Sequence, residues 1–348
     1  MAGQTLKPLV GLVLGDPAGI GPELAARLAA DSSVAEAVRL LIIGDRRIFD
    51  RGAEIAGTWP VAAAIYESEL PQVLPGQHRF LDVRSVDPAA VVTGRAGEPG
   101  GASALANFRK ALDLGAERLV DAVCYTPFNK SAMRKSYPDY EDEVSFSAEH
   151  LGLPVTDIAE FNIQPRLWSA RVTSHVPLSR VASLLTVESI LNRIVLTDRA
   201  MRTAGNEFCR IAVAGLNPHA GDEGNFGREE IDVIGPAVEA ARARGFDCSG
   251  PYSPDTVYVR ARAGEFDAVL TMYHDQGQIA MKLMGFFEGV VYFAGLPFPL
   301  TTPAHGTAYE ISGQGKADIG ANRGAVLLAG RMAGRMAGRM VGEPLAVG

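Results

Sequence analysis

The sequence predicts an α/β protein with a largely parallel sheet, and two observations support this prediction. Short apolar runs alternate along the chain with longer stretches that have helical periodicity. Polar, glycine-containing loops follow the ends of these runs. Strands that alternate with helices are typical of parallel sheets, and open α/β sheets bind ligands at the carboxyl ends of their strands. We therefore expect functional residues in the loops after the apolar runs.

The elements follow from this alternation in chain order. Helical periodicity predicts helices at Pro22 to Ala30, Ala102 to Leu119 and Glu229 to Ala243. The buried strands that the apolar runs predict are Leu9 to Leu14, Leu40 to Ile43, Ala122 to Tyr125, Arg210 to Ala214 and Ala268 to Met272. An AGRM repeat at Ala329 to Met340 is interpreted as a terminal helix with solvated arginines, although its glycine stripe also permits close helix packing.

Composition excludes several classes of protein. The 348 residues are 47% hydrophobic, which suffices for one large or two mid-sized domains. A net charge of -7 argues against a nucleic-acid partner. Cys124, Cys209 and Cys248 form no CxxC motif and are expected to be free thiols. Residues 1–10 contain no long apolar run, so we expect no signal peptide or membrane anchor, and a cytoplasmic location.

A glycine-rich turn lies between the first predicted strand and helix. Its sequence, GDPAGIGPE, covers Gly15 to Glu23. Glycines at such a turn let the backbone approach a dinucleotide pyrophosphate, but the spacing differs from GxGxxG. Pro22 fits the first turn of a helix. On these residues alone, a cofactor loop and a tight structural turn are equally supported.

Three histidines, His175, His219 and His274, each begin a loop that follows an apolar run. Imidazole nitrogen binds divalent transition ions, and three such ligands leave positions open for substrate oxygens. Asp255 and Asp275 could orient a ligand histidine or complete the ligand set. A single histidine in this setting is more often structural, but three together favour a metal site.

Another polar loop and two lysines complete the candidates. His305 to Ala308 could contact an adenine or ribose through backbone groups, with a surface turn as the alternative. Lys130 and Lys282 could bind a substrate carboxylate, or donate a proton if burial lowers the pKa of the ammonium group. A solvated lysine is the default interpretation of each.

These motifs together resemble the 4-hydroxythreonine-4-phosphate dehydrogenase family. GDPAGIGPE, PFNK, TSHVPL, GLNPHAGDEGNFG, GPYSPDT, MYHDQG and HGTAYEISGQGKAD occur in the family's order. The first and last are also similar to segments of isocitrate and isopropylmalate dehydrogenases. The resemblance implies their two-lobed fold, parallel-rich sheets flanked by helices, and an active site in the interdomain cleft. We expect a cofactor-side domain at 1–130 plus 297–348, and a second domain at 131–296 with the metal ligands and dimer contacts.

The resemblance also implies roles for individual residues. It implies NAD, although the residues give no firm cue for NAD over NADP, and one divalent metal, with zinc favoured over magnesium, manganese or cobalt. The implied metal ligands, in a homodimer with shared active sites, are His175, His219 and His274. The implied cofactor contacts are Gly15, Asp16, Gly19, His305, Gly306, Thr307 and Ala308. The catalytic candidates are Lys130, Asp255, Asp275 and Lys282, the last as a substrate contact.

The chain departs from the family pattern where phosphate-handling members contact phosphate. Those members carry GHTE after the PxNK lysine, where this chain has the acidic run Glu141 to Glu143. They carry Asn and Arg where this chain has Val291 and Leu300. Acidic charge repels phosphate, and an apolar wall suits a ring. This pattern is similar to the terephthalate cis-dihydrodiol dehydrogenase branch.

The sequence therefore favours a metal-dependent, decarboxylating NAD dehydrogenase that oxidises a secondary alcohol beside a carboxylate. The expected substrate is an unphosphorylated, carboxylated cis-dihydrodiol of aromatic catabolism. The alternative is 4-hydroxythreonine-4-phosphate in pyridoxine and pyridoxal phosphate biosynthesis. A remote alternative is a non-catalytic binding protein on the same fold. No nucleic acid or membrane partner is expected.

Overall fold

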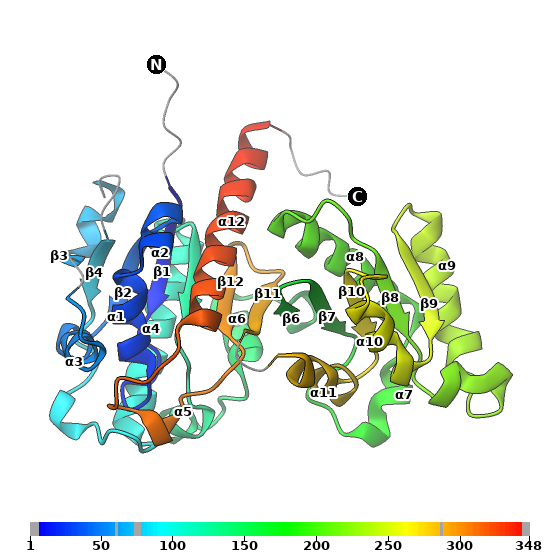
Figure 1. The fold of residues 1–348 in the computed structure, drawn as a ribbon, viewed down its shortest axis with the longest axis horizontal. Helices are drawn as coiled ribbons and strands as arrows, with labels where there is room; N and C mark the ends of the chain where they lie inside the picture. The colour runs from blue at the N-terminus through cyan, green and yellow to red at the C-terminus, as the bar shows by residue number, and fades with distance from the viewer. Residues whose placement is uncertain (1–6, 60–61, 73–77, 286–287, 343–348) are drawn as a thin grey trace. The chain divides into compact units, whose positions relative to one another are not determined.

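The computed structural model describes residues 7–59, 62–72, 78–285 and 288–342. The chain divides into two compact units, Met1–Ile158 with Leu296–Gly348, and Ala159–Gly295 (Figure 1). The helices α5 (Lys130–Ser136) and α6 (Glu143–Leu151) therefore belong to the first unit. The units separate at 158/159, whereas the predicted domains separate at 130/131, and the functional division into domains stays a prediction.

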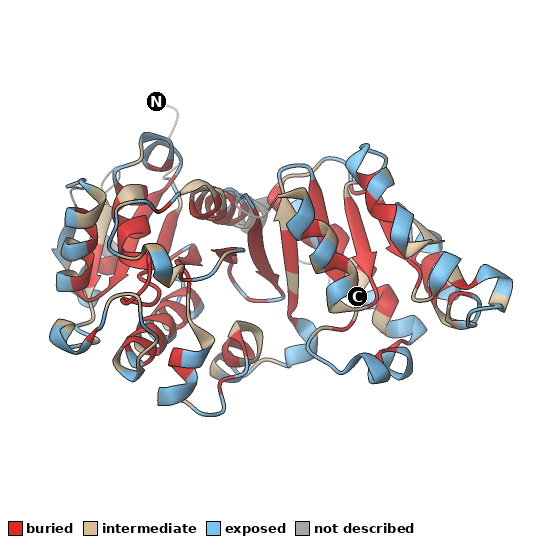
Figure 2. Cartoon of the chain, turned by 60° about the horizontal axis from the view of Figure 1, so that its bottom comes forward, coloured by how far each residue is buried: buried red, intermediate tan, exposed pale blue. Residues whose placement is uncertain are grey.

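The first unit contains a parallel sheet in the strand order β3-β4-β2-β1-β5-β12. Its strands are β1 (Leu9–Val13), β2 (Arg39–Gly44), β3 (Ala62–Ile65), β4 (His78–Asp82), β5 (Ala122–Tyr125) and β12 (Leu300–Pro303). Its further helices are α1 (Gly21–Ala29), α2 (Ser32–Ala37), α3 (Arg46–Ala56), α4 (Glu98–Ala116) and α12 (Gly320–Gly342). Every residue of β1, β2 and β5 is buried (Figure 2), which explains their continuous apolar sequences.

The second unit contains a mixed sheet in the order β11-β6-β7-β10-β8-β9. Its strands are β6 (Ala159–Gln164), β7 (Leu167–Arg171), β8 (Ile211–Ala214), β9 (Cys248–Tyr252), β10 (Ala268–Thr271) and β11 (Val290–Ala294). Its helices are α7 (Val181–Leu184), α8 (Val187–Ala204), the π-helical segment Glu230–Ile234, α9 (Gly235–Ala243), α10 (Pro254–Arg262) and α11 (His274–Met284). β7, β10, β8 and β9 are parallel, whereas β6 runs antiparallel to β7 and β11.

Short 3₁₀ turns connect several of these elements. They lie at Glu67–Gln72, Pro88–Ala90, Val155–Asp157, Leu178–Arg180 and Tyr309–Ile311. The α/β class and the mostly parallel sheets flanked by helices confirm the fold class predicted from the sequence. The predicted strands and helices are all present, with shifts at their ends. The antiparallel β6 was not predicted, and the likeness to isocitrate and isopropylmalate dehydrogenases stays a prediction.

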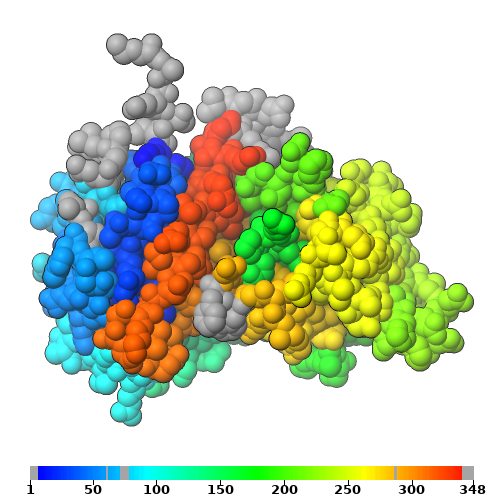
Figure 3. Space-filling view, in the orientation of Figure 1, coloured from blue at the N-terminus to red at the C-terminus, as the bar shows by residue number. Residues whose placement is uncertain are grey.

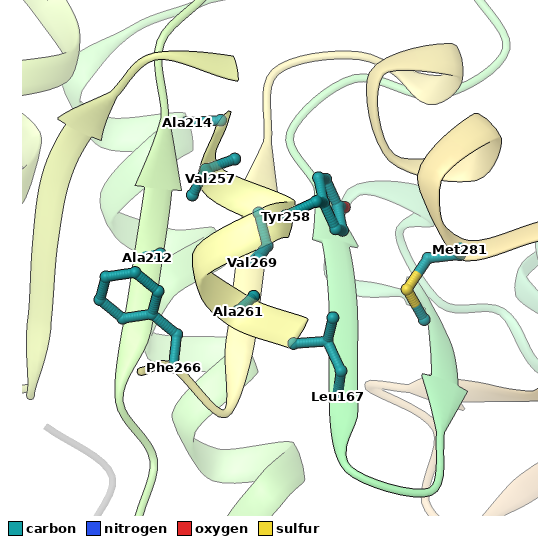
Figure 4. Packing of buried hydrophobic residues seen from close by; sticks show 9 residues of the cluster. All are labelled: Leu167, Ala212, Ala214, Val257, Tyr258, Ala261, Phe266, Val269 and Met281. Carbon is teal, nitrogen blue, oxygen red and sulfur yellow. The ribbon is translucent and has the colours of Figure 1, made fainter. Parts of the chain in front are cut away.

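One core cluster of the second unit anchors the helices that carry functional candidates. Figure 4 shows Tyr258 of α10 and Met281 of α11 over side chains from β7, β8 and β10. The Tyr258 hydroxyl also forms a hydrogen bond with the Ser169 hydroxyl at 2.6 Å. Because α11 begins at His274, its packing through Met281 holds one end of a candidate metal loop.

The C-terminal repeat forms part of α12. A Cβ atom added at Gly330 would collide with Val38, whereas Gly338 has open space around it. Arg331 and Arg335 are exposed, as the favoured interpretation predicts. The side chains of residues 339–342 lie outside the described part of the chain. Close packing therefore involves the first glycine of the repeat.

Two predictions based on composition can be compared with the structure. The three cysteines are free, as predicted, and all three are buried. Within the residues that the structure describes, no helix has both the length and the apolar character needed to cross a membrane. Residues 1–6, which begin the segment predicted to lack an anchor, lie outside these residues.

Candidate active site

Two segments that are far apart in sequence contact each other in the first unit, and we call them the paired loops (15–23 and 305–317). The Ile20 amide donates to the Thr307 carbonyl at 3.1 Å. The Ser312 hydroxyl donates to the Ala18 carbonyl at 2.9 Å. A Cβ atom on Gly19 would lie 2.9 Å from the Thr307 carbonyl oxygen, so only glycine permits this approach. The structure thus brings together the two segments predicted to contact the cofactor.

Asp16 is the buried centre of the paired loops. Its side chain is fully buried and accepts hydrogen bonds from the Tyr309 hydroxyl at 2.6 Å and the Ala18 amide at 2.8 Å. Burial raises the pKa of the Asp16 carboxyl, and these two hydrogen bonds partly oppose the rise. Gly100, in the first turn of α4, packs so closely that an added Cβ would lie 2.9 Å from Asp16 Oδ1. Asp16 therefore ties the glycine turn to the second loop from within.

The start of α1 is held by the same pair of loops. Pro22 occupies the first turn, as predicted, and Glu23 is 2% exposed. Glu23 Oε1 accepts from the Ala317 amide at 3.0 Å. Beside these loops lies a cavity of about 170 Å³, with Ala18 on one side and the first turn of α4 on the other.

The remaining predicted cofactor residues differ in exposure. Gly306 is exposed and Thr307 is buried, while His305 Nδ1 lies 3.1 Å from the Gly306 carbonyl oxygen. Ala308 has a φ of 44°, in the left-handed region, and turns the chain towards Tyr309. Gly15 also has a positive φ, 27°, and packs against the backbone of Thr126. Their role as cofactor contacts stays a prediction. All of these residues lie in the paired loops.

In the second unit, His175 and His274 lie next to each other. Their ring centroids are 5.7 Å apart, on the loops that follow β7 and β10. His274 Nδ1 lies 2.7 Å from Asp275 Oδ1, an approach that orients the ring and leaves Nε2 for another partner. Carboxylates commonly hold metal-binding histidines in this way.

His219 lies on an unusual loop after β8. His219, Ala220, Asp222 and Glu223 have φ values of 54°, 54°, 44° and 53°. Left-handed backbone costs an L-residue about 1–2 kcal/mol, so this run is strained. Glu230, which is 4% exposed, accepts hydrogen bonds from the Leu216 and Asn217 amides at the entrance to the loop.

The donor chemistry fits a divalent metal, but one chain does not assemble all three histidines. No group of three or more His, Cys, Asp or Glu side chains is arranged to hold a metal ion in the part of the chain described. The His219 ring lies beside Phe226 instead, with centroids 6.1 Å apart. The Ser253 hydroxyl, which donates to Asp255 Oδ1 at 2.6 Å, lowers the pKa of the Asp255 carboxyl most, with a smaller electrostatic effect of His219. Two histidines are thus together, and the third is not grouped with them.

The two candidate lysines have different surroundings. Lys130 Nζ lies 3.3 Å from Glu143 Oε2 in the first unit. Lys282 is exposed on α11, the helix that begins at His274. Lys282 is therefore free to meet a ligand, whereas the charge of Lys130 is already balanced.

The structure corrects the interpretation of the acidic run 141–143. Asp142 caps α6 by accepting from the Ser145 amide at 2.8 Å, and Glu143 pairs with Lys130. Leu300 is 0% exposed in β12 and Val291 is 8% exposed in β11, so neither side chain forms an open apolar wall. The predicted repulsion of phosphate counted three free charges, whereas Asp142 and Glu143 have partners within the first unit.

Sequence reasoning missed two residues that organise these loops. Tyr309 follows the HGTA segment directly, and Glu230 lies in the run Arg228-Glu229-Glu230 after the His219 loop. Neither stands out locally, because an exposed tyrosine or glutamate is the ordinary interpretation of such positions. The sequence feature that could have identified Glu230 is its position at the start of an apolar helical pattern.

Comparison with known sequences gives one consistent result. Residues 36–329 match the family described as "Pyridoxal phosphate biosynthetic protein PdxA". A Rhizobium meliloti protein provisionally named 4-hydroxythreonine-4-phosphate dehydrogenase 2 is 55% identical over 93% of both chains. A D-threonate 4-phosphate dehydrogenase of Pectobacterium atrosepticum is 34% identical, over 90% of this chain and 95% of its own.

Solved structures give the same result. A 4-hydroxythreonine-4-phosphate dehydrogenase from Klebsiella pneumoniae superposes with a TM-score of 0.80 at 33% identity, covering 95% of this chain and 99% of its own. A terephthalate 1,2-cis-dihydrodiol dehydrogenase from Burkholderia xenovorans is more distant. It has a TM-score of 0.67 and 26% identity, covering 93% of this chain and 98% of its own.

Proposed function

Because the chain belongs to the family of the pyridoxal phosphate biosynthetic protein PdxA, we propose that it is an NAD-dependent dehydrogenase of 4-hydroxythreonine-4-phosphate. The structural observation that carries the proposal is the contact between the paired loops. Ile20 and Thr307, 287 positions apart by their numbers, share a backbone hydrogen bond at the predicted cofactor segments. Dehydrogenases of this family use NAD and a divalent metal.

This proposal replaces the dihydrodiol substrate expected from the sequence. That expectation was wrong: the relative at 55% identity carries the name of a phosphate-substrate enzyme, whereas the terephthalate enzyme shares 26%. Two of its physical grounds also differ in the structure, because Lys130 pairs with Glu143 and Leu300 is buried in β12. A role in aromatic catabolism, which depended on the dihydrodiol substrate, is therefore not proposed.

The proposed reaction oxidises the secondary alcohol beside the carbon that carries the carboxylate. The alcohol carbon gives a hydride to NAD⁺ and the hydroxyl gives up its proton, which leaves a β-keto acid. This acid loses carbon dioxide, and the carbon that keeps the electron pair takes up a proton. A bound divalent cation supplies Lewis-acid stabilisation of negative charge on the substrate oxygen.

Residues of each unit have a place in this proposal. In the first unit, the paired loops would hold NAD, with exposed Gly306 accessible to it and Asp16 fixing the loop from beneath. In the second, His175 and His274 would bind the metal while Asp275 orients His274. Lys282 would bind an anionic group of the substrate because its ammonium group is exposed.

We further propose a homodimer in which His219 reaches the metal of the partner subunit. Two histidines of one chain are adjacent and the third is not grouped with them. The second unit also exposes large apolar side chains that a partner could cover, among them Leu178 at 68%, Ile279 at 61% and Leu283 at 84%. The last two lie on α11, which is at the surface in Figure 3.

The direct test measures NAD reduction with the purified protein and added Zn²⁺, Mg²⁺, Mn²⁺ or Co²⁺. The substrates are 4-hydroxythreonine-4-phosphate, unphosphorylated 4-hydroxythreonine and D-threonate 4-phosphate, the last because of the Pectobacterium relative. We expect the phosphorylated amino acid to give the highest kcat/KM, at least about tenfold above the unphosphorylated one, since charge-assisted bonds are worth about 1.5–3 kcal/mol each. Higher kcat/KM for D-threonate 4-phosphate would reassign the substrate.

Charge variants locate the anion contact. Lys282→Ala should raise KM for the substrate while KM for NAD stays unchanged, because the predicted NAD loops belong to the other unit. Lys110→Ala is the matched control, since Lys110 pairs with Glu67 on the first unit and has no proposed ligand. Equal effects of the two variants would contradict the role of Lys282.

A further inference from the structure

The loop that carries His219 is bound at its entrance and its middle to a single buried carboxylate. Glu230 Oε1 accepts from the Leu216 amide at 2.7 Å and from the Asn217 amide at 2.8 Å. Glu230 Oε2 accepts from the Asn217 side-chain amide at 2.9 Å. Three N–H donors thus converge on a side chain that is 4% exposed.

The same carboxylate also limits the shape of the loop beyond His219. A Cβ atom on Gly221 would lie 2.7 Å from Glu230 Oε2, and one on Gly215 would lie 3.0 Å from Oε1. The loop therefore wraps around Glu230 before and after His219. Between these contacts, His219 and Ala220 both keep a φ of 54°. Such strained backbone persists only where surrounding contacts fix it, and it is frequent at functional sites.

The helix that supplies Glu230 is also irregular at this point. The π-helical segment Glu230–Ile234 precedes α9 and begins at Glu230 itself. Single π-helical turns are frequent at functional sites, where they redirect a side chain. Here the irregular turn coincides with the carboxylate that the loop surrounds.

We infer that Glu230 is a positioning residue that fixes the direction of His219 towards the metal. The inference rests on the proposed function, in which His219 is a metal ligand. Glu230 does not touch substrate, cofactor or metal in this arrangement. It acts through the backbone of Leu216 and Asn217, which lead directly into His219.

The test uses Co²⁺ binding to the intact protein, followed by visible absorption of the bound ion, beside steady-state kinetics. Glu230→Ala removes both acceptor oxygens, and Glu230→Gln keeps one acceptor oxygen in nearly the same shape. Partners that orient a metal ligand commonly contribute 10–100-fold in metal affinity. We expect Glu230→Ala to weaken Co²⁺ binding by about 10–100-fold, with Glu230→Gln in between. KM for NAD should not change.

A matched control separates positioning from general stability. Asp267 also accepts from a backbone amide, that of Arg210 at 3.0 Å, in the same unit. Asp267→Asn should lower the unfolding temperature without altering the Co²⁺ spectrum, because the Asp267 carboxylate binds Arg210, which lies outside the His219 loop. If Glu230→Ala fails to fold, Glu230→Gln alone tests the inference.

The outcomes distinguish this inference from the proposed function. Wild-type Co²⁺ binding that is unchanged in both Glu230 variants would overturn the positioning role and leave the metal site intact. An equal loss in Asp267→Asn and Glu230→Gln would reduce the role of Glu230 to general stability and overturn the inference. Failure of the unaltered protein to bind Co²⁺ would overturn the proposed metal chemistry, and the inference with it.

Discussion

The paired loops of the first unit and the three histidine loops of the second differ in how completely their own unit holds them. In the paired loops, Asp16 is fully buried and backbone bonds such as Ile20 to Thr307 join the segments. In the histidine loops, His175 and His219 are exposed, and only His175 and His274 are adjacent. The first region is preorganised by its own contacts. The second region contains three histidines that could bind a metal. Within one chain, these histidines do not form a complete metal site.

This contrast explains why we place NAD binding within one subunit and metal binding between two. A preorganised loop loses little conformational entropy on binding a ligand. A metal site that two symmetric chains share is complete only when both chains have assembled. The following predictions test the contrast, beginning with the largest expected effect.

Removal of a histidine should have the largest effect, and pairs of variants should reveal how the subunits share the site. His175→Ala, His219→Ala or His274→Ala should each lower kcat/KM by about 100-fold or more, because Lewis-acid stabilisation is worth several kcal/mol. Mixed dimers of His219→Ala with His274→Ala should recover activity, up to about a quarter of wild type after random mixing in a two-fold symmetric dimer. His175→Ala mixed with His274→Ala should not recover.

The last pairing is decisive because the adjacency of His175 and His274 in one chain predicts it. Verified heterodimers supply the control for assembly, and size-exclusion chromatography measures it. Recovery in the His175→Ala and His274→Ala mixture would mean that these two ligands come from different subunits. His175 and His219 would then come from one subunit and His274 from the other.

Substitution of Gly19 should have the next largest effect, on the paired loops. An added methyl group would lie 2.9 Å from both the Thr307 carbonyl oxygen and its Cβ atom, which are backbone or nearly so and cannot swing away. We expect Gly19→Ala to lower the free energy of unfolding by about 1–3 kcal/mol and to raise KM for NAD. Gly338→Ala in α12 is the control, since nothing lies within 4 Å of its added methyl and the residue has no proposed ligand. An unchanged Gly19→Ala variant would show that the paired loops are not tightly held.

Loss of the Tyr309 hydroxyl should have a smaller and pH-dependent effect. The hydrogen bond from Tyr309 lowers the pKa of Asp16, which burial has raised, so Tyr309→Phe raises that pKa further. A contribution that lowers the pKa of a folded-state carboxyl is present where the group is ionised and fades as the pH falls through its pKa. Tyr309→Phe should therefore destabilise the protein by about 1 kcal/mol at neutral pH and by less in acid.

Thermal unfolding across this pH range measures the difference between Tyr309→Phe and the unaltered protein. Tyr66→Phe is the matched control because Tyr66 is 78% exposed. A loss of stability in Tyr309→Phe that is equal at all pH values would show that Asp16 does not titrate against this bond. The preorganisation of the paired loops would then depend on their backbone contacts alone.

The two regions also differ in how far the sequence alone could describe them. Buried strands such as β1 and β5 are visible in the sequence as apolar runs, and the loops that follow them were predicted from it. The contact between Asp16 and Tyr309 was not predicted, because 293 positions separate the partners and no periodicity relates them. The substrate prediction failed for a similar reason. Glu143 was counted as a free charge, whereas Lys130 lies 3.3 Å from it.

The antiparallel β6 shows the same limit in the fold. It pairs with β7 and β11, and its residues are buried or half-buried without a clear alternation. A short stretch of mixed polar and apolar residues does not reveal its direction or its neighbours. Local pattern therefore predicts that an element exists, and long-range pairing decides where it lies.

The smallest expected effect is a gain in stability at the strained histidine loop. Glu223 is exposed with a φ of 53°, a conformation that costs an L-residue about 1–2 kcal/mol and glycine almost nothing. Glycine also makes the unfolded chain more flexible, which offsets part of the gain by about 0.4–1 kcal/mol. Glu223→Gly should therefore raise the free energy of unfolding by a few tenths to about 1 kcal/mol, measured by urea denaturation. Glu239→Gly, at an exposed position inside α9, should instead lower it by about 1 kcal/mol. If both variants lost stability equally, the left-handed run would not be strained, and the contrast between a preorganised pair of loops and a strained histidine loop would not hold at this residue.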